Sequence, residues 1–224
     1  MEVYFFPLNQ VTVESSKTLS RNSIQHFYDR AARFYRWFSI FESEVKNTAV
    51  ENLELAPGQK LLNVGLGTGS EQQDFLKCLF PGGTVFGIDL SFKMLQVASL
   101  TTKGFLCQGD ARDLPLSNAV FDRIYCAFVL DLVLEVDIPT WLAGFRRVLK
   151  PGGRMVMLSL VEGVNLPSKM LVSAWKQLYR IDPRICGGCR PLELSRWTAD
   201  AGFECIERRV IVQLGLPTEV VVAV

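Results

Sequence analysis

The residues best placed to do chemistry are a glycine-rich loop and two aspartates, each at the end of a predicted strand. The loop 65–69 reads Gly-Leu-Gly-Thr-Gly, and Asp89 and Asp110 end or follow the next two apolar segments. Glycines let the backbone turn sharply and approach a ligand closely, and open α/β sheets bind nucleotide-like ligands at the carboxyl ends of their strands. Asp89 can accept both hydroxyls of a ribose, and Asp110 can accept the amino group of an adenine. Together these features predict an adenosine-binding site that lacks a phosphate-binding loop.

Two other interpretations of this pattern stay open. The loop can be a plain strand-to-helix turn, and both aspartates can be helix or turn caps. A dinucleotide fingerprint wants glycine at its first, third and sixth positions. Counted from Gly65, the sixth position is Ser70, whereas the loop has its glycines at 65, 67 and 69. The spacing therefore disfavours binding of NAD.

The elements that position these residues alternate between strand and helix. Such alternation predicts a parallel sheet with helices on both faces. Near the end, segments 203–209, 210–214 and 219–222 follow one another without a helix, which implies antiparallel pairing at the sheet edge. The expected strands are 60–64, 84–89, 105–108, 121–127 and 154–160, and the expected helices are 70–80, 92–101, 138–149 and 192–201.

The N-terminal quarter has a different pattern. We expect residues 1–20 to form an arm. Helices are expected at 22–41 and 42–53, and Pro57-Gly58 ends the helical segment. We therefore expect an arm and helical lid over residues 1–56 and a Rossmann-like domain over 57–224, within one structural domain. Ten of the 24 aromatic residues lie in the first 41 positions. The first helix can thus cover an apolar acceptor, pack on the sheet, or contact a membrane surface through its arginines.

Composition narrows the classes of partner. The 224 residues include 24 Lys and Arg against 23 Asp and Glu, so no basic excess predicts nucleic acid binding. No run approaches the roughly 20 apolar residues that span a bilayer, and the N-terminal apolar run is too short for a signal peptide. We expect a cytoplasmic protein, at most peripheral to a membrane. The six cysteines predict buried thiols in a reducing compartment.

Two of the cysteines lie close together in the sequence. Cys186-Gly187-Gly188-Cys189 is a lone Cys-x-x-Cys, and a zinc site would normally need two further ligands. We therefore expect no metal site, and we expect this loop to roof the acceptor pocket. Arg184 and Arg190 beside it can contact an anionic substrate group or face solvent, and we expect them to face solvent.

The chain resembles class I S-adenosylmethionine (SAM) dependent methyltransferases over about residues 22 to 224. The resemblance implies a Rossmann-like, doubly wound sheet of seven strands, mostly parallel, whose last strand inserts antiparallel. The motifs that carry it are Asn63-Val64-Gly65-Leu66-Gly67-Thr68-Gly69, Gly87-Ile88-Asp89-Leu90-Ser91, Gly109-Asp110-Ala111 with Leu114-Pro115, Phe121-Asp122-Arg123-Ile124-Tyr125-Cys126-Ala127, Leu149-Lys150-Pro151-Gly152-Gly153 and Ala201-Gly202-Phe203.

The resemblance also implies which residues hold SAM and its product S-adenosylhomocysteine. The loop with Gly65, Leu66, Gly67, Thr68 and Gly69 flanks the methionine part. The ribose and adenine fall to Asp89, Leu90, Met94, Gly109, Asp110 and Ala111, and the ammonium meets the backbone of Cys126 and Ala127. Asn63 departs from the acid that many relatives carry there, and it keeps hydrogen bonding but loses a charge.

The segment 27–35 is similar to the N-terminal helix of the ubiquinone/menaquinone C-methyltransferase group and of phospholipid N-methyltransferases. The resemblance places Tyr28 and Tyr35 near the methyl donor. Arg36 departs from the quinone group's usual Asp, and Ala127-Phe128-Val129-Leu130-Asp131 replaces its Arg-Asn motif.

The expected function is methyl transfer to a small apolar or amphiphilic acceptor such as a quinol or phenol. Its alternatives are N-methylation of a phospholipid amine and a non-catalytic SAM-binding regulator. If the acceptor needs a base, the candidates are Asp131, His26 and the two tyrosines.

Overall fold

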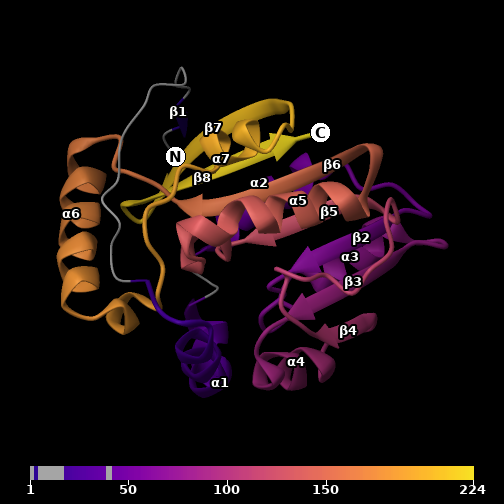
Figure 1. Ribbon diagram of the computed structural model, residues 1–224, viewed down its shortest axis with the longest axis horizontal. Helices are drawn as coiled ribbons and strands as arrows, with labels where there is room; N and C mark the ends of the chain where they lie inside the picture. Colours follow the sequence, from indigo (N-terminus) through magenta and orange to yellow (C-terminus); the bar gives the residue numbers. More distant parts are fainter. Residues whose placement is uncertain (1–2, 5–17, 39–41) are drawn as a thin grey trace.

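A single mixed sheet forms the centre of the protein (Figure 1). The computed structural model describes residues 3–4, 18–38 and 42–224, with no side chains described at 3–4 and 33–38. Its described strands run in the order β1-β7-β8-β6-β5-β2-β3-β4. Their bounds are β1 Val3–Tyr4, β2 Lys60–Val64, β3 Thr84–Asp89, β4 Phe105–Gln108, β5 Phe121–Ala127, β6 Leu149–Leu160, β7 Cys205–Gln213 and β8 Leu216–Ala223.

The predicted doubly wound topology is confirmed. Strands β2 to β6 pair in parallel, and β8 inserts antiparallel between β6 and β7. The two-residue β1 adds an eighth strand to the expected seven, antiparallel to β7. Segments 203–209 and 210–214, expected as two strands, form the single strand β7.

Helices cover both faces of this sheet, because successive strand residues alternate between two cores. Leu61 packs with α2 and α3 in one core, whereas Leu62 packs with α5 and α7 in the other. The helices are α1 Arg21–Phe38, α2 Ser43–Asn52, α3 Gln72–Leu79, α4 Phe92–Ser99, α5 Ile138–Val148, α6 Leu166–Ile181 and α7 Leu194–Asp200. In the described part of the chain, no helix is both long and apolar enough to cross a bilayer.

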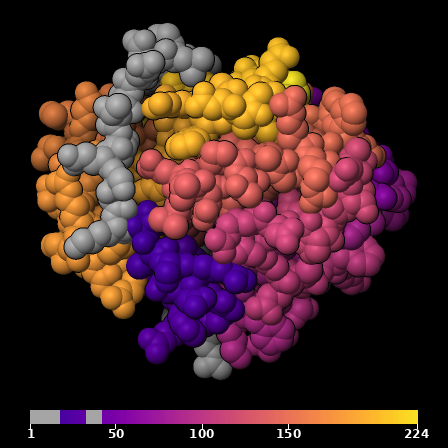
Figure 2. Space-filling model, in the orientation of Figure 1, coloured from indigo at the N-terminus to yellow at the C-terminus, as the bar shows by residue number. Residues whose placement is uncertain are grey.

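Helix α6 was not predicted, although the chain carries a start signal for it. The Asn165 side chain accepts a hydrogen bond from Ser168 N at 2.9 Å, and Ser168 Oγ accepts one from Asn165 N at 3.0 Å. This is a capping box with serine in the place of the usual Glu or Gln. The helix lies at one flank of the fold, and Figure 2 shows the indigo surface of α1 between α6 and the magenta segment that includes α4.

Two of the cysteine expectations were wrong. Cys78 and Cys107 are exposed. Cys107 lies on β4, which is the edge strand of the sheet, so an apolar run there does not ensure burial on both faces. All six thiols are free of disulfides.

Candidate active site

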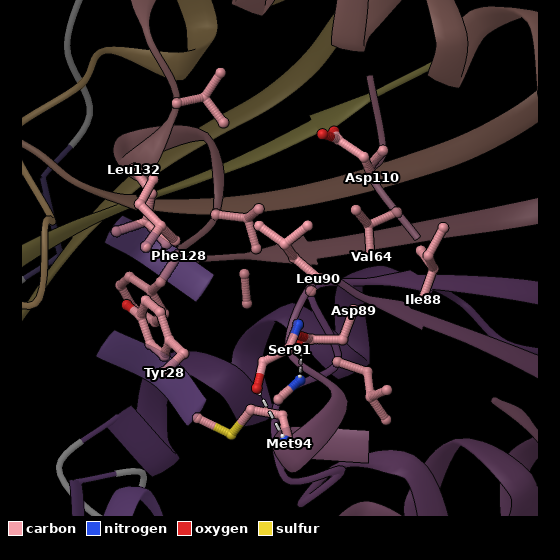
Figure 3. Close-up of a pocket in the computed structure, with 18 of the residues that line it drawn as sticks. Tyr28, Val64, Ile88, Asp89, Leu90, Ser91, Met94, Asp110, Phe128 and Leu132 are labelled. Carbon is pink, nitrogen blue, oxygen red and sulfur yellow. Dashed lines mark hydrogen bonds between the residues drawn. The ribbon is translucent and has the colours of Figure 1, made fainter. Parts of the chain in front are cut away.

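A cavity opens at the carboxyl ends of β2, β3 and β5, beneath the first turns of α1 (Figure 3). The structure brings most of the predicted site residues to its wall. They are Tyr28, Asn63, Gly65, Leu66, Gly67, Asp89, Leu90, Met94, Gly109, Asp110, Ala111 and Ala127.

The glycine loop has the backbone geometry that only glycine adopts without strain. Gly65 has a φ of +65°, in the left-handed region, and a Cβ there would collide with the Val129 side chain. The amides of Gly65 and Leu66 both donate to Ile88 O, at 2.8 and 3.3 Å. The end of β2 is thereby held against β3, with the loop facing the cavity.

Asp89 is fixed by backbone amides from both sides. Its Oδ2 accepts from Gly67 N at 2.8 Å and its Oδ1 accepts from Ser91 N at 2.8 Å. Each carboxylate oxygen can accept a further hydrogen bond. Burial raises the pKa of Asp89 to about 6, even though these amides act to lower it. Asp89 is therefore oriented in advance to receive two hydroxyl donors.

Asp110 is paired with two arginines that the sequence analysis did not single out. Arg112 Nη2 lies 2.7 Å and Arg21 Nε lies 2.9 Å from Asp110 Oδ2. Although burial acts to raise the pKa of Asp110, the hydrogen bonds and charge of Arg112 hold it below its usual value. Arg112 Nη1 also lies 3.4 Å from Asp137. The carboxylate thus stays ionised in the cavity wall.

Helix α1 is fastened over this cavity at three points. Besides the Arg21 pair, Asp29 Oδ1 accepts from Ser91 Oγ at 2.5 Å and from Lys93 N at 3.3 Å. The Tyr28 hydroxyl donates to Gly187 O at 3.2 Å. Tyr28 and Asp29 therefore connect α1 to the Cys186–Cys189 loop and to the start of α4.

A charged cluster that the sequence analysis missed lies at the glycine-loop end of the cavity. Lys46 Nζ from α2 lies 3.0 Å from Glu71 Oε1 and 3.0 Å from Glu42 Oε2, and Lys46 and Glu71 line the cavity. Burial acts to lower the pKa of Lys46, but the two carboxylates outweigh it and raise the pKa. Asn63, beside them, donates from Nδ2 to Gln72 Oε1 at 3.1 Å. A lysine in a short helix gives no sequence signal by itself; only the packing of α2 shows it.

Several predicted residues lie outside the cavity wall. The cavity wall does not include Thr68, Gly69 or Cys126. Cys126 belongs to β5, and its side chain is buried in the core. His26 is exposed and also lies outside it. The side chain of Tyr35 lies outside the described residues.

Asp131 is fully buried but does not reach the cavity. Neither of its carboxylate oxygens has a hydrogen-bond partner among the described residues, and burial raises its pKa to about 7. Arg190, expected to face solvent, is only 4% exposed. Its Nη1 donates to the backbone oxygen of Asp131 at 2.9 Å, because the chain after Cys189 turns inward against the segment Leu130–Leu132. The solvent-facing expectation for Arg190 was wrong.

The chain is similar to several methyltransferases. Residues 62–157 match the family described as "Methyltransferase domain". The ubiquinone/menaquinone biosynthesis C-methyltransferase UbiE of Teredinibacter turnerae is 35% identical over 127 residues, which cover 54% of this chain and 50% of that protein. The chain spans about half the length of the curated relatives it matches.

Solved structures share the fold at low sequence identity. A SAM-dependent methyltransferase from Aquifex aeolicus superposes with a TM-score of 0.59 at 19% identity, over 92% of this chain and 98% of that one. Geranyl diphosphate C-methyltransferase from Streptomyces coelicolor, solved with Mg²⁺, geranyl diphosphate and S-adenosylhomocysteine, superposes with a TM-score of 0.60 at 15% identity, over 81% and 78%. Residues 62–157 therefore match a methyltransferase domain, and the chain is similar to a member of the ubiquinone/menaquinone C-methyltransferase group.

Proposed function

We propose that the protein transfers the methyl group of SAM to a small apolar or amphiphilic acceptor. The observation that carries the proposal is the convergence of the Gly65–Gly69 loop, Asp89 and Asp110 on one cavity. In this arrangement Asp89 accepts the two ribose hydroxyls and Asp110, with the backbone of Ala111, binds the adenine edge. Leu90 and Met94 supply apolar contacts to the adenosine.

The methionine end of SAM lies, in this proposal, between the glycine loop and the Lys46–Glu71 pair. That end of SAM carries both an ammonium and a carboxylate. Lys46 matches the carboxylate and Glu71 the ammonium, because opposite charges within hydrogen-bond reach favour each other most strongly where water is excluded. This pair offsets the charge that Asn63 lacks.

The acceptor binds on the side of the cavity that holds Tyr28, Phe128 and Leu132, opposite Asp110 in Figure 3. Phe128 has a φ of +54°, which is uncommon for a bulky residue and is typical of functional sites. Apolar walls with a few polar groups suit a small organic ligand. The quinone-related name of the T. turnerae relative and the geranyl diphosphate bound to the S. coelicolor enzyme support an acceptor of this kind.

SAM, when bound, supplies the electrophilic methyl group. The chain contributes alignment and exclusion of water: the aspartates and glycine loop fix the cofactor, while Tyr28 and Phe128 hold the acceptor in line. Such positioning can supply roughly 7–11 kcal/mol in ideal cases. Tyr28 is our candidate catalytic residue, through its hydroxyl group.

Calorimetric titration with S-adenosylhomocysteine, with NADH as the parallel control, tests the cofactor assignment. We expect micromolar binding of S-adenosylhomocysteine alone. A screen with labelled SAM against quinols, phenols and phospholipid amines then tests the acceptor class. Ion pairs or hydrogen bonds engage all the described carboxylates of the cavity wall, which are Glu71, Asp89, Asp110 and Asp137. None of these groups is therefore free to act as a general base. An amine with a free lone pair needs no strong base, so N-methylation of an amine is the second candidate. Binding without turnover on the whole panel would favour a regulatory SAM-binding protein instead.

A further inference from the structure

Helix α6 presents an exposed apolar stripe that its packing does not require. Leu166, Met170, Ala174, Leu178 and Ile181 recur at spacings of four and three residues, which places them on one face. Leu166, Met170 and Ile181 are 72%, 67% and 75% exposed, and Ala174 and Leu178 are exposed as well. Large contiguous apolar patches of this kind mark interaction sites.

The opposite face of α6 attaches it to the body of the protein. Ser168, Val172 and Tyr179 are buried there, and Trp175 Nε1 donates to Cys189 O at 2.9 Å. The helix is therefore held in place by this buried face, and the most exposed stripe residues, Leu166, Met170 and Ile181, contribute little to it. Removal of stripe residues should leave the fold intact.

The charges of α6 indicate the kind of partner. The helix carries Lys169, Lys176 and Arg180 and no acidic residue. Lys176 pairs with Glu162 at 2.7 Å, whereas Lys169 and Arg180 form no ion pair with any residue in the described ranges. Basic residues beside an apolar face are typical of helices that lie in the interface of an anionic membrane. Their aliphatic stems can follow the apolar surface while their charged ends reach phosphates.

The stripe leads toward the part of the cavity wall that holds Tyr28. Beyond Ile181 it continues to Ile185, which is 57% exposed. Gly187, two residues further on, accepts the hydrogen bond from the cavity residue Tyr28. Figure 1 shows the end of α6 near α1. A surface that held the stripe would thus lie near the part of the cavity wall that Tyr28 forms.

We propose that α6 docks the protein in the plane of an anionic lipid surface, with the stripe Leu166–Ile185 at the headgroup level and Lys169 and Arg180 on lipid phosphates. This proposal concerns where the enzyme works and does not depend on the methyl acceptor. It also differs from the membrane contact expected of α1, because it assigns the contact to α6.

Flotation of the full chain with vesicles tests the proposal. Vesicles of phosphatidylcholine alone are compared with phosphatidylcholine and phosphatidylglycerol in a 3:1 ratio, at low and high salt. We expect binding to the anionic vesicles that weakens with salt. The double substitution Met170→Glu and Ile181→Glu should weaken it at least about tenfold, because it removes two inserted apolar groups and adds repelled charges. Lys169→Glu with Arg180→Glu should abolish the preference for anionic lipid.

Leu100→Glu is the matched control, since Leu100 is 82% exposed at the end of α4, away from the stripe. It should float as the unchanged protein does. Unchanged thermal unfolding and S-adenosylhomocysteine binding show that each variant is folded. Absence of flotation, equal binding to neutral vesicles, or normal flotation of the Met170 and Ile181 variant overturns the proposal. The proposal is also overturned if the protein self-associates with rising concentration and the Met170 and Ile181 variant does not, since a second copy would then occupy the stripe.

Discussion

Arg21 Nε lies 2.9 Å from Asp110 Oδ2, so the first residue of α1 is paired with the carboxylate that follows β4. The pair joins the N-terminal helix to the side of the cavity that holds Asp110. Because Arg21 is half exposed, its contribution should be modest. Helix α1 is thus held over the cavity by several individually weak contacts.

Arg21→Gln should therefore accelerate release of S-adenosylhomocysteine by no more than about fivefold, the equivalent of about 1 kcal/mol. Stopped-flow displacement measures the rate, and salt should reduce the difference between the two proteins. Arg30→Gln, at an exposed position of the same helix, is the control. An unchanged release rate at low salt would remove the pair from any role in closure.

Asp89→Ala should weaken binding of S-adenosylhomocysteine by roughly tenfold or more, because it leaves the ribose hydroxyls and the Gly67 amide without their acceptor. Calorimetry measures the dissociation constant. Asp74→Ala removes an exposed carboxylate from α3 and should have no effect. Near-normal affinity of the Asp89 variant would show that the ribose lies elsewhere.

The affinity for S-adenosylhomocysteine should fall as the pH falls through about 6. Burial raises the pKa of Asp89 to about 6, and the bound state needs the ionised carboxylate to accept two hydroxyls. Below that pH the free protein holds a proton that binding must displace, so affinity drops by up to about tenfold per pH unit. Above about pH 7 the affinity should be flat. Titrations from pH 5 to 8 check this, and Asp89→Asn should lose the dependence.

Tyr28→Phe should lower turnover more than cofactor affinity. Its hydroxyl donates to Gly187 O and faces the acceptor side of the cavity, while the ring keeps its edge-on contact with Phe27 at 5.3 Å between centroids. Initial rates with an acceptor from the screen, set beside calorimetry, separate the two effects. Equal losses of both quantities, or of neither, would take Tyr28 off the list of catalytic residues.

The sequence predicted the parts of the fold that repeat a local pattern. Alternation of apolar segments and glycine turns located β2 to β5, and with them Asp89 and Asp110, since a strand end fixes where its next residue points. The position of β8 between β6 and β7 came from the family resemblance, because strand order depends on long-range packing that no local pattern encodes.

The missed features share a different cause. Lys46 and Arg190 are charged residues that tertiary contacts bury, and composition alone predicts that such residues face solvent. Helix α6 has an exposed apolar stripe opposite its buried face, so apolar residues occur on both sides of the helix and do not mark one face as the core side. Its Asn165–Ser168 capping box and Pro167 in the first turn were local signals that could have revealed it.

Asp131→Asn should stabilise the protein increasingly as the pH rises. The pKa of Asp131 is raised to about 7 in the folded state, chiefly by burial and against the attraction of Arg190, from about 3.9 in an unfolded chain. Stability from this carboxyl is therefore full below about pH 4 and is lost as the pH rises through about 7. Asp131→Asn has no carboxyl to ionise there, so it lacks that loss. The difference between its free energy of unfolding and that of the unchanged protein should therefore grow by about 1.4 kcal/mol per pH unit between about pH 4 and pH 7.

Urea unfolding at pH 5 and pH 7.5 measures the difference. Since Asp131 does not line the cavity, the variant should keep its affinity for S-adenosylhomocysteine and its turnover. A stability difference that stays constant with pH would contradict the buried, proton-binding carboxyl. Loss of turnover with normal cofactor binding would instead favour Asp131 as the general base. In that case Leu130–Leu132 would have to rearrange, so that the buried carboxyl could reach the acceptor.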